Sequence, residues 1–272
     1  MRLERWSRVL LAVAAVLFVF TGLSYFLLPD YAAENFAWDV SPLAAMTIGG
    51  WNIGFGFAAL DSVRDWSPTR GNASLIAIWS GSLLGASVLV VLGGSVRLDH
   101  PLAWTFAAAL AIGLASGLLG LPALWTRRKE STGASPVETP AWLRRGFGSV
   151  GVLLLGVAVA WLVPEMFAQA VLPGPLSGPT TAAFGAFYAA IGLGALVLAF
   201  SDDLETAIRY TRHVLYIFVL ITFAALSYLH LFDFAARPTQ LAFVGGNVLA
   251  AVAGVAFLAW SRRYTTGPAW RP

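Results

Sequence analysis

The sequence contains no cysteine and little charge, and each shortage excludes a class of protein. Without cysteine the chain forms no disulfide, no thiolate metal site and no cysteine nucleophile. Charged residues make up 11% of the chain and hydrophobic residues 58%, whereas soluble domains carry about 25% charged residues. Because so few charges cannot cover a water-facing surface, the composition predicts an integral membrane protein.

Lysine is nearly absent, and the position of the one lysine excludes another function. Lys129 falls in a polar segment between apolar runs, so no membrane span can carry a retinal-type Schiff base. The formal net charge is +3 and the sequence pI is about 9.5. The basic residues lie in short loops between apolar runs, which indicates membrane orientation rather than binding of nucleic acid.

Ionisable groups and catalytic motifs are missing from the apolar runs. All 14 acidic residues fall in loops or at the ends of predicted spans, whereas ion-coupled carriers usually place an ionisable group inside a span. The chain has no G-x-S-x-G or H-E-x-x-H motif and no phosphate-binding glycine loop. We therefore expect a protein that is not an enzyme and that holds no metal or cofactor.

Apolar segments of about 20 residues, the length that crosses a bilayer, recur along the whole chain. They predict an all-α polytopic membrane bundle of eight transmembrane helices. The predicted spans are residues 7–28, 42–60, 72–92, 101–125, 143–163, 180–200, 208–231 and 241–260.

Arginine and lysine are distributed unevenly over the loops between these spans. All but two of the 17 basic residues fall on one side of the predicted membrane, and the exceptions are Arg97 and Arg237. Positive charge accumulates on the cytoplasmic side of membrane proteins. The sequence therefore predicts a multi-pass protein of the cell (plasma) membrane with both termini in the cytoplasm.

The two halves of the chain resemble each other, which indicates an internal duplication. The end of the fourth span, residues 124–128 (LWTRR), matches the end of the eighth, residues 259–263 (AWSRR). Each half has four spans, so we expect parallel repeats related by a pseudo-two-fold axis along the membrane normal. The predicted organisation is a first repeat at 1–125, a cytoplasmic linker at 126–141, a second repeat at 142–264 and a cytoplasmic tail at 265–272.

The second span is rich in glycine, and the sixth span repeats its pattern. Ile53-Gly54-Phe55-Gly56 lines up with Ile191-Gly192-Leu193-Gly194. Gly50 and Gly54 form a small-xxx-small pair, which lets two helix backbones approach closely in lipid. We expect these two glycines to face another helix of the same chain.

Two amides, Asn52 and Asn247, fall deep within predicted spans. A buried amide costs free energy unless it is hydrogen-bonded. Either amide forms an ordinary contact between helices, or it binds a ligand near the middle of the bilayer. Both are candidate ligand-binding residues.

Each repeat also carries an arginine, an aspartate and a histidine at its outer end, just before a proline. The sets are Arg97, Asp99 and His100 in the first repeat, and His230, Asp233 and Arg237 in the second. Each set forms either an interfacial ion pair or part of a paired site for an anionic headgroup or acidic ligand. For an internal pair, Arg97 should contact Asp99 or another acid, and Arg237 should contact Asp233.

Histidine allows one further alternative, a membrane haem. Two histidines on facing helices at similar depth would be needed, and only His100 and His230 lie near the same surface. His213 lies near the opposite end of its span without a partner histidine.

Each four-span unit resembles the DoxX-like four-helix membrane proteins. The features that carry the resemblance are Leu28-Pro29-Asp30 after the first span, the glycine-rich second span and the Gly/Ala-rich closing pair of helices. The resemblance implies a fold and no catalytic residue, and this chain would contain the unit twice.

Three functions stay open at this point. The first is a non-catalytic helper subunit or a binder of a lipid-like or small apolar ligand between the two halves. The second is a transporter of a neutral or apolar substrate, and the third is a haem- or quinone-linked redox protein. Expected partners are membrane lipid and a membrane protein or a second copy of the chain.

Overall fold

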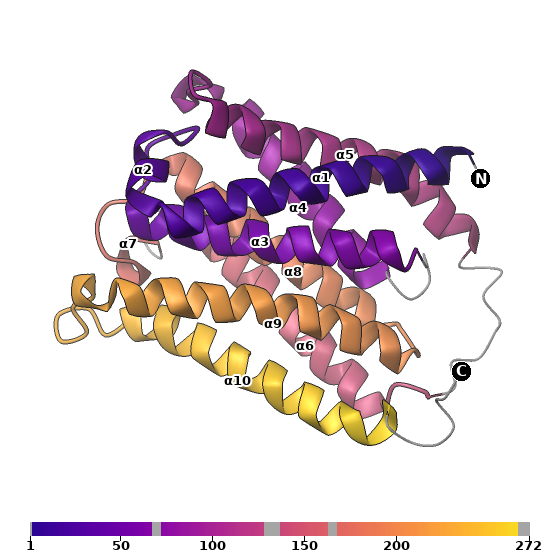
Figure 1. Cartoon of the computed structure of the whole chain (residues 1–272). Coiled ribbons are helices and arrows are strands. Elements are labelled where there is room, and N and C mark those ends of the chain that lie inside the picture. Colours follow the sequence, from indigo (N-terminus) through magenta and orange to yellow (C-terminus); the bar gives the residue numbers. More distant parts are fainter. Residues whose placement is uncertain (1, 67–71, 128–136, 163–167, 266–272) are drawn as a thin grey trace.

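The structure is a computed structural model that describes residues 2–66, 72–127, 137–162 and 168–265 (Figure 1). The described residues form α-helices and two short 3₁₀ helices, with no β-strand among them. The predicted all-α bundle is therefore confirmed.

Eight helices of the described residues are long and apolar enough to cross a membrane, as the sequence predicts. They are α1 (Arg2–Leu27), α3 (Pro42–Arg64), α4 (Asn72–Val91), α5 (Pro101–Arg127), α6 (Ala141–Trp161), α8 (Gly178–Ala199), α9 (Leu204–Ser227) and α10 (Gln240–Thr265). The short elements are α2 (Pro29–Glu34), α7 (Ala168–Val171), η1 (Gly93–Ser95) and η2 (Leu229–Leu231).

Local sequence explains where the second helix of each half begins. The Ser41 side chain accepts a hydrogen bond from the Ala44 amide at the start of α3. Ser177 accepts one from the Thr180 amide at the start of α8. In both helices a proline occupies the first turn, where its missing N–H costs nothing. A serine cap followed by a proline within two residues therefore marks the first turn of both α3 and α8.

The bundle has two distinct ends, visible in Figure 1. Helix α1 begins and helix α10 ends at the same side of the bundle, which we call the terminal end. The short helices α2 and α7 lie at the opposite end, called here the α2 end.

Helix α3 is the most buried of the spanning helices, because glycines let neighbours approach it on two sides. A Cβ added at Gly49 would lie 2.7 Å from the Phe26 amide nitrogen of α1. On another face, a Cβ at Gly50 would lie 3.0 Å from Leu220 Cβ, and Ile217 leaves no room for one at Gly54. The prediction that Gly50 and Gly54 face a helix of the same chain is confirmed, and that helix is α9.

The helix contacts repeat in the two halves. In the first, α3 packs on α1 and α4 on α5; in the second, α8 packs on α6 and α9 on α10. Across the halves, α3 packs on α9 and α4 packs on α8. If the first half is exchanged with the second, each of these helix contacts corresponds to another one of the set.

Aromatic side chains fill the space between the central helices α3 and α8. The Trp51 ring lies 4.2 Å from the Phe187 ring and 4.6 Å from the Phe184 ring, centre to centre. Phe55 stacks on Phe187 at 5.6 Å. This packing occupies the part of the interface between the halves where the sequence led us to expect a ligand.

Candidate functional site

One contact of the first half has no counterpart in the second, and a cavity lies in its place. Helix α1 packs closely along α5, whereas the backbones of α6 and α10 make little or no contact. The space between α6, α8, α9 and α10 is a cavity of about 600 Å³, within the usual range for small-molecule sites. The described residues that line it all belong to the second half of the chain.

Aromatic pairs join α6 to α10 at the terminal end of the bundle. The Trp142 and Trp260 rings lie 5.6 Å apart, and the Phe147 and Phe257 rings 5.8 Å apart. At this end, ring contacts rather than close backbone contacts join α6 to α10.

The cavity is long and follows the helix axes. Its wall on α6 runs from Leu143 to Trp161, which is about 27 Å at 1.5 Å per residue. The hydrocarbon core of a bilayer is about 30 Å thick. The cavity therefore extends along most of the membrane thickness, and an elongated apolar molecule fits its shape.

Among the described residues, the cavity wall is almost entirely apolar and carries no charged side chain. Its polar side chains are two tyrosines, Tyr188 and Tyr210, together with Thr211, Asn247 and Trp161, whose ring carries an N–H group. The Tyr210 hydroxyl donates a hydrogen bond to the Ile191 carbonyl. The Tyr210 hydroxyl proton is therefore already bonded within the protein.

Tyr188 and Asn247 are polar residues on the cavity wall. Both side chains are more than nine-tenths buried, at 7% and 3% exposure. Asn247 Nδ2 donates a hydrogen bond to the Phe243 carbonyl at 2.7 Å. Asn247 Oδ1 has no hydrogen-bond partner among the described residues, so the Tyr188 hydroxyl does not donate to it.

The other predicted amide, Asn52, does not reach this cavity. It is fully buried in α3, and neither Nδ2 nor Oδ1 has a hydrogen-bond partner among the described residues. A buried polar group left without a partner costs about 1–3 kcal/mol. The two predicted amides are therefore in different surroundings, and only Asn247 lines a cavity.

In the first outer set, the arginine has an acidic partner from a different loop. Arg97 Nη2 lies 2.8 Å from Asp39 Oδ1, and both side chains are largely exposed. The Arg97 amide also donates to the Ala37 carbonyl. Arg97 thus contacts an acid, as expected for an internal pair, although the acid is Asp39 rather than Asp99.

His100 is held locally within the first half. Its Nδ1 accepts a hydrogen bond from the Leu102 amide at the start of α5, at 3.2 Å. Its Nε2 lies 3.3 Å from the Tyr31 hydroxyl. Asp99 is exposed beside it.

The second outer set is arranged differently. The Asp233 carboxylate accepts a hydrogen bond from the Ala236 amide, and Asp233 and Arg237 are joined through their backbones. His230 and Arg237 are exposed. Among the described residues no hydrogen bond or ion pair links this set to Arg97, Asp99 or His100.

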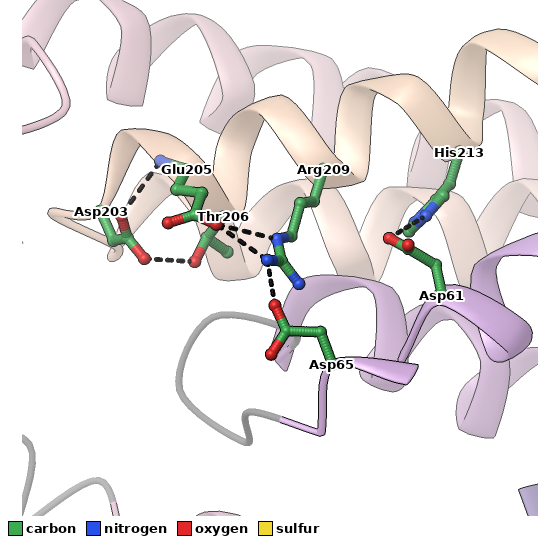
Figure 2. A network of polar contacts seen from close by, with 7 residues as sticks. All are labelled: Asp61, Asp65, Asp203, Glu205, Thr206, Arg209 and His213. Atoms are coloured by element: carbon green, nitrogen blue, oxygen red, sulfur yellow. Dashed lines mark hydrogen bonds and ion pairs between the residues drawn. The ribbon is translucent and has the colours of Figure 1, made fainter. Parts of the chain in front are cut away.

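A polar cluster at the terminal end was not recognised in the sequence. Figure 2 shows that His213 of α9 faces Asp61 of α3, with Nε2 3.1 Å from Oδ2. Its Nδ1 lies 2.9 Å from Ser74 Oγ of α4. Because Ser74 and His213 are both buried, the three side chains join helices rather than present a nucleophile.

Arg209, one turn before His213, extends the cluster. It forms ion pairs with Asp65, which follows α3, and with Glu205 at 2.8 Å on its own helix (Figure 2). Asp203 caps α9 through the Glu205 amide. Sequence spacing could not reveal the contacts of His213 with Asp61 and of Arg209 with Asp65, because these residues lie about 150 positions apart and only the bundle brings them together.

Comparisons with protein-family models, with curated proteins and with solved structures found no match for this chain.

Proposed function

We propose that this multi-pass membrane protein is non-catalytic and binds a lipid-like or small apolar ligand in the cavity between α6, α8, α9 and α10. The observation that carries the proposal is the long apolar cavity. It lies in the second half at the place where α1 and α5 contact each other directly in the first half. The site lies within the second half, rather than between the halves as the sequence suggested.

The surroundings of the cavity support binding from the membrane. Helices α6 and α10 are the least buried spanning helices of the described residues. Large apolar side chains such as Leu153 and Leu249 are exposed and also line the cavity. In a bilayer such side chains face lipid, so an apolar molecule can enter sideways between the two helices.

We also propose that the terminal end faces the cytoplasm and that the membrane is the plasma membrane. The support is the distribution of arginine and lysine, of which all but Arg97 and Arg237 lie on that side of the predicted spans.

Filling the cavity with a side chain tests the proposal. Gly246 lines the cavity, and a Cβ added there meets no atom within 4 Å. Gly245 has equally open surroundings but does not line the cavity. Gly246→Phe should therefore occupy binding space, and Gly245→Phe is its matched control.

The purified protein in detergent is labelled with a diazirine-bearing alkyl probe, and the labelled peptides are identified by mass spectrometry. We expect labels on the cavity walls of α6, α9 and α10, lost in Gly246→Phe and kept in Gly245→Phe. Equal labelling of wild type and both variants, or labels confined to outer helix faces, would overturn the proposal.

A further inference from the structure

We infer that the ligand is a neutral lipid with a hydroxyl group toward one end, and that this hydroxyl donates a hydrogen bond to Asn247 Oδ1. The inference rests on the proposed function, because it concerns the chemistry of the same cavity.

Asn247 Oδ1 is an acceptor that the described part of the protein leaves unused. The side chain lines the cavity and is 3% exposed. Its Nδ2 donates to the Phe243 carbonyl at 2.7 Å, and this bond fixes which atom of the carboxamide is the oxygen, because a carbonyl accepts but does not donate. Oδ1 has no hydrogen-bond partner among the described residues. The group that completes this site is therefore a donor.

Water does not suit this position as the donor. A buried water typically makes two to four hydrogen bonds to polar groups, whereas the described wall of the cavity is almost entirely apolar. The cavity also lies between α6 and α10, the two least buried spanning helices of the described residues, and the bilayer core around them holds no water. The donor therefore belongs to a lipid-like molecule that enters from the membrane.

The donor is uncharged. No charged side chain lies on the described wall, so an ammonium group would be buried there without a counter-charge, which is costly in hydrocarbon. An amide N–H would bring a carbonyl oxygen that needs a donor of its own. A hydroxyl group adds a single polar atom, and it is the simplest neutral donor for an apolar cavity.

Thr211 is the second polar side chain of the wall whose oxygen has no partner among the described residues. Its hydroxyl can both donate and accept, so it does not select the chemistry of a ligand, whereas Asn247 Oδ1 only accepts. Each residue lies seven positions after the start of its helix, which is about 10 Å. Helices α9 and α10 run in opposite directions (Figure 1). Asn247 and Thr211 therefore lie near opposite ends of the bundle, and one hydroxyl does not contact both.

The position of Asn247 along the cavity indicates where the ligand carries its hydroxyl. On α10 the lining residues extend from Ala242 to Phe257. Asn247 is about 8 Å from the first and about 15 Å from the second at 1.5 Å per residue. The longer part of the cavity thus lies on the terminal-end side of Asn247. We expect the apolar chain to extend that way, with the hydroxyl toward the α2 end.

Competition between dodecanol and its methyl ether tests the inference. The two probes share one alkyl chain, but the alcohol can donate a hydrogen bond and the ether can only accept. Each is titrated against the diazirine-bearing alkyl probe in the same detergent, and the ratio of alcohol to ether competition is compared between variants. Partition of the probes into detergent cancels in this comparison.

Asn247→Leu should lower the ratio about three- to tenfold, the value of one net hydrogen bond. Asn52→Leu is the matched control, because it makes the same substitution at a buried amide that does not line the cavity, and it should keep the wild-type ratio. Thr211→Val should also keep that ratio. Melting curves of the three variants verify that they fold.

The outcomes separate the inference from the proposed function. A ratio that Asn247→Leu leaves unchanged, or that Thr211→Val lowers instead, overturns the assignment of a hydroxyl to Asn247 and leaves the cavity as a site. Competition by neither probe in the wild-type protein overturns both.

Discussion

His213 Nε2 lies 3.1 Å from Asp61 Oδ2, and this contact fastens α9 to α3 across the two halves of the chain. The other ring nitrogen of His213 contacts Ser74 of α4, so one side chain joins three helices. Because His213 is almost fully buried, the arrangement should contribute to the free energy of unfolding.

Replacing His213 should therefore destabilise the protein. In His213→Phe the ring volume is kept, but Ser74 and Asp61 each lose a partner. A buried group that loses its hydrogen bond costs about 1–3 kcal/mol, so the midpoint of denaturant unfolding in detergent should fall. Glu138→Gln, at an exposed residue outside the cluster, is a control. An unchanged midpoint for His213→Phe would show that the cluster does not hold the halves together.

Gly54→Leu should be destabilising, because Ile217 of α9 occupies the space beside Gly54. Forcing a larger side chain into a packed contact typically costs about 1–3 kcal/mol. The matched control is Gly156→Leu, because a Cβ added at Gly156 meets no atom within 4 Å. Melting in detergent should separate the two variants, and equal melting would mean that Gly54 does not face α9.

Removing the Arg97 side chain should have a small effect on stability. Arg97 and Asp39 are 50% and 88% exposed at the side chain, and exposed ion pairs contribute about 0.2–1 kcal/mol. Arg97→Ala should lower the unfolding free energy by no more than this amount, and Arg237→Ala by less. A larger loss in either variant, measured by denaturant titration, would contradict the assignment of that arginine to an exposed contact.

Asn52→Leu should stabilise the protein by about 1 kcal/mol or leave it unchanged. Both polar atoms of Asn52 are buried without partners among the described residues, and a leucine of similar size removes that penalty. Thermal unfolding of the variant is the measurement. A clear loss of stability would reveal a partner for the amide, and the hypothesis of a ligand at Asn52 would regain support.

A reporter fused to the C-terminus tests the orientation. An enzyme that is active only outside the cytoplasm, such as alkaline phosphatase, should be inactive there, because we propose from the charge distribution that this end faces the cytoplasm. The same reporter inserted after Asp99 should be active. Activity at the C-terminus would contradict the proposed orientation.

The sequence was sufficient to predict the spans, because each long apolar run must form a helix in a membrane. It also placed Gly50 and Gly54 at a helix contact, since small residues at four-residue spacing allow close approach. Spacing gave no reason to prefer Asn247 over Asn52 as a cavity residue. That difference depends on how the helices pack, because a cavity lies beside Asn247 whereas Asn52 is fully buried in α3.

The contacts of His213 and Arg97 could not be predicted for a related reason. Their partners Asp61 and Asp39 belong to other segments of the chain, and hydropathy does not specify which helices become neighbours. The expected Asp233–Arg237 side-chain pair is absent. The Asp233 carboxylate instead accepts a hydrogen bond from the Ala236 amide and closes a turn.

The unequal burial of the helices has a consequence for backbone hydrogen exchange. Helix α3 is enclosed by α1 and α9, so its amides should open only when the whole bundle unfolds. Helices α6 and α10 each pack mainly on one long neighbour, and their amides should open through smaller, local fluctuations. A bound apolar ligand would contact both of those helices. Occupancy of the cavity should therefore slow deuterium uptake in α6 and α10 and leave the uptake in α3 unchanged.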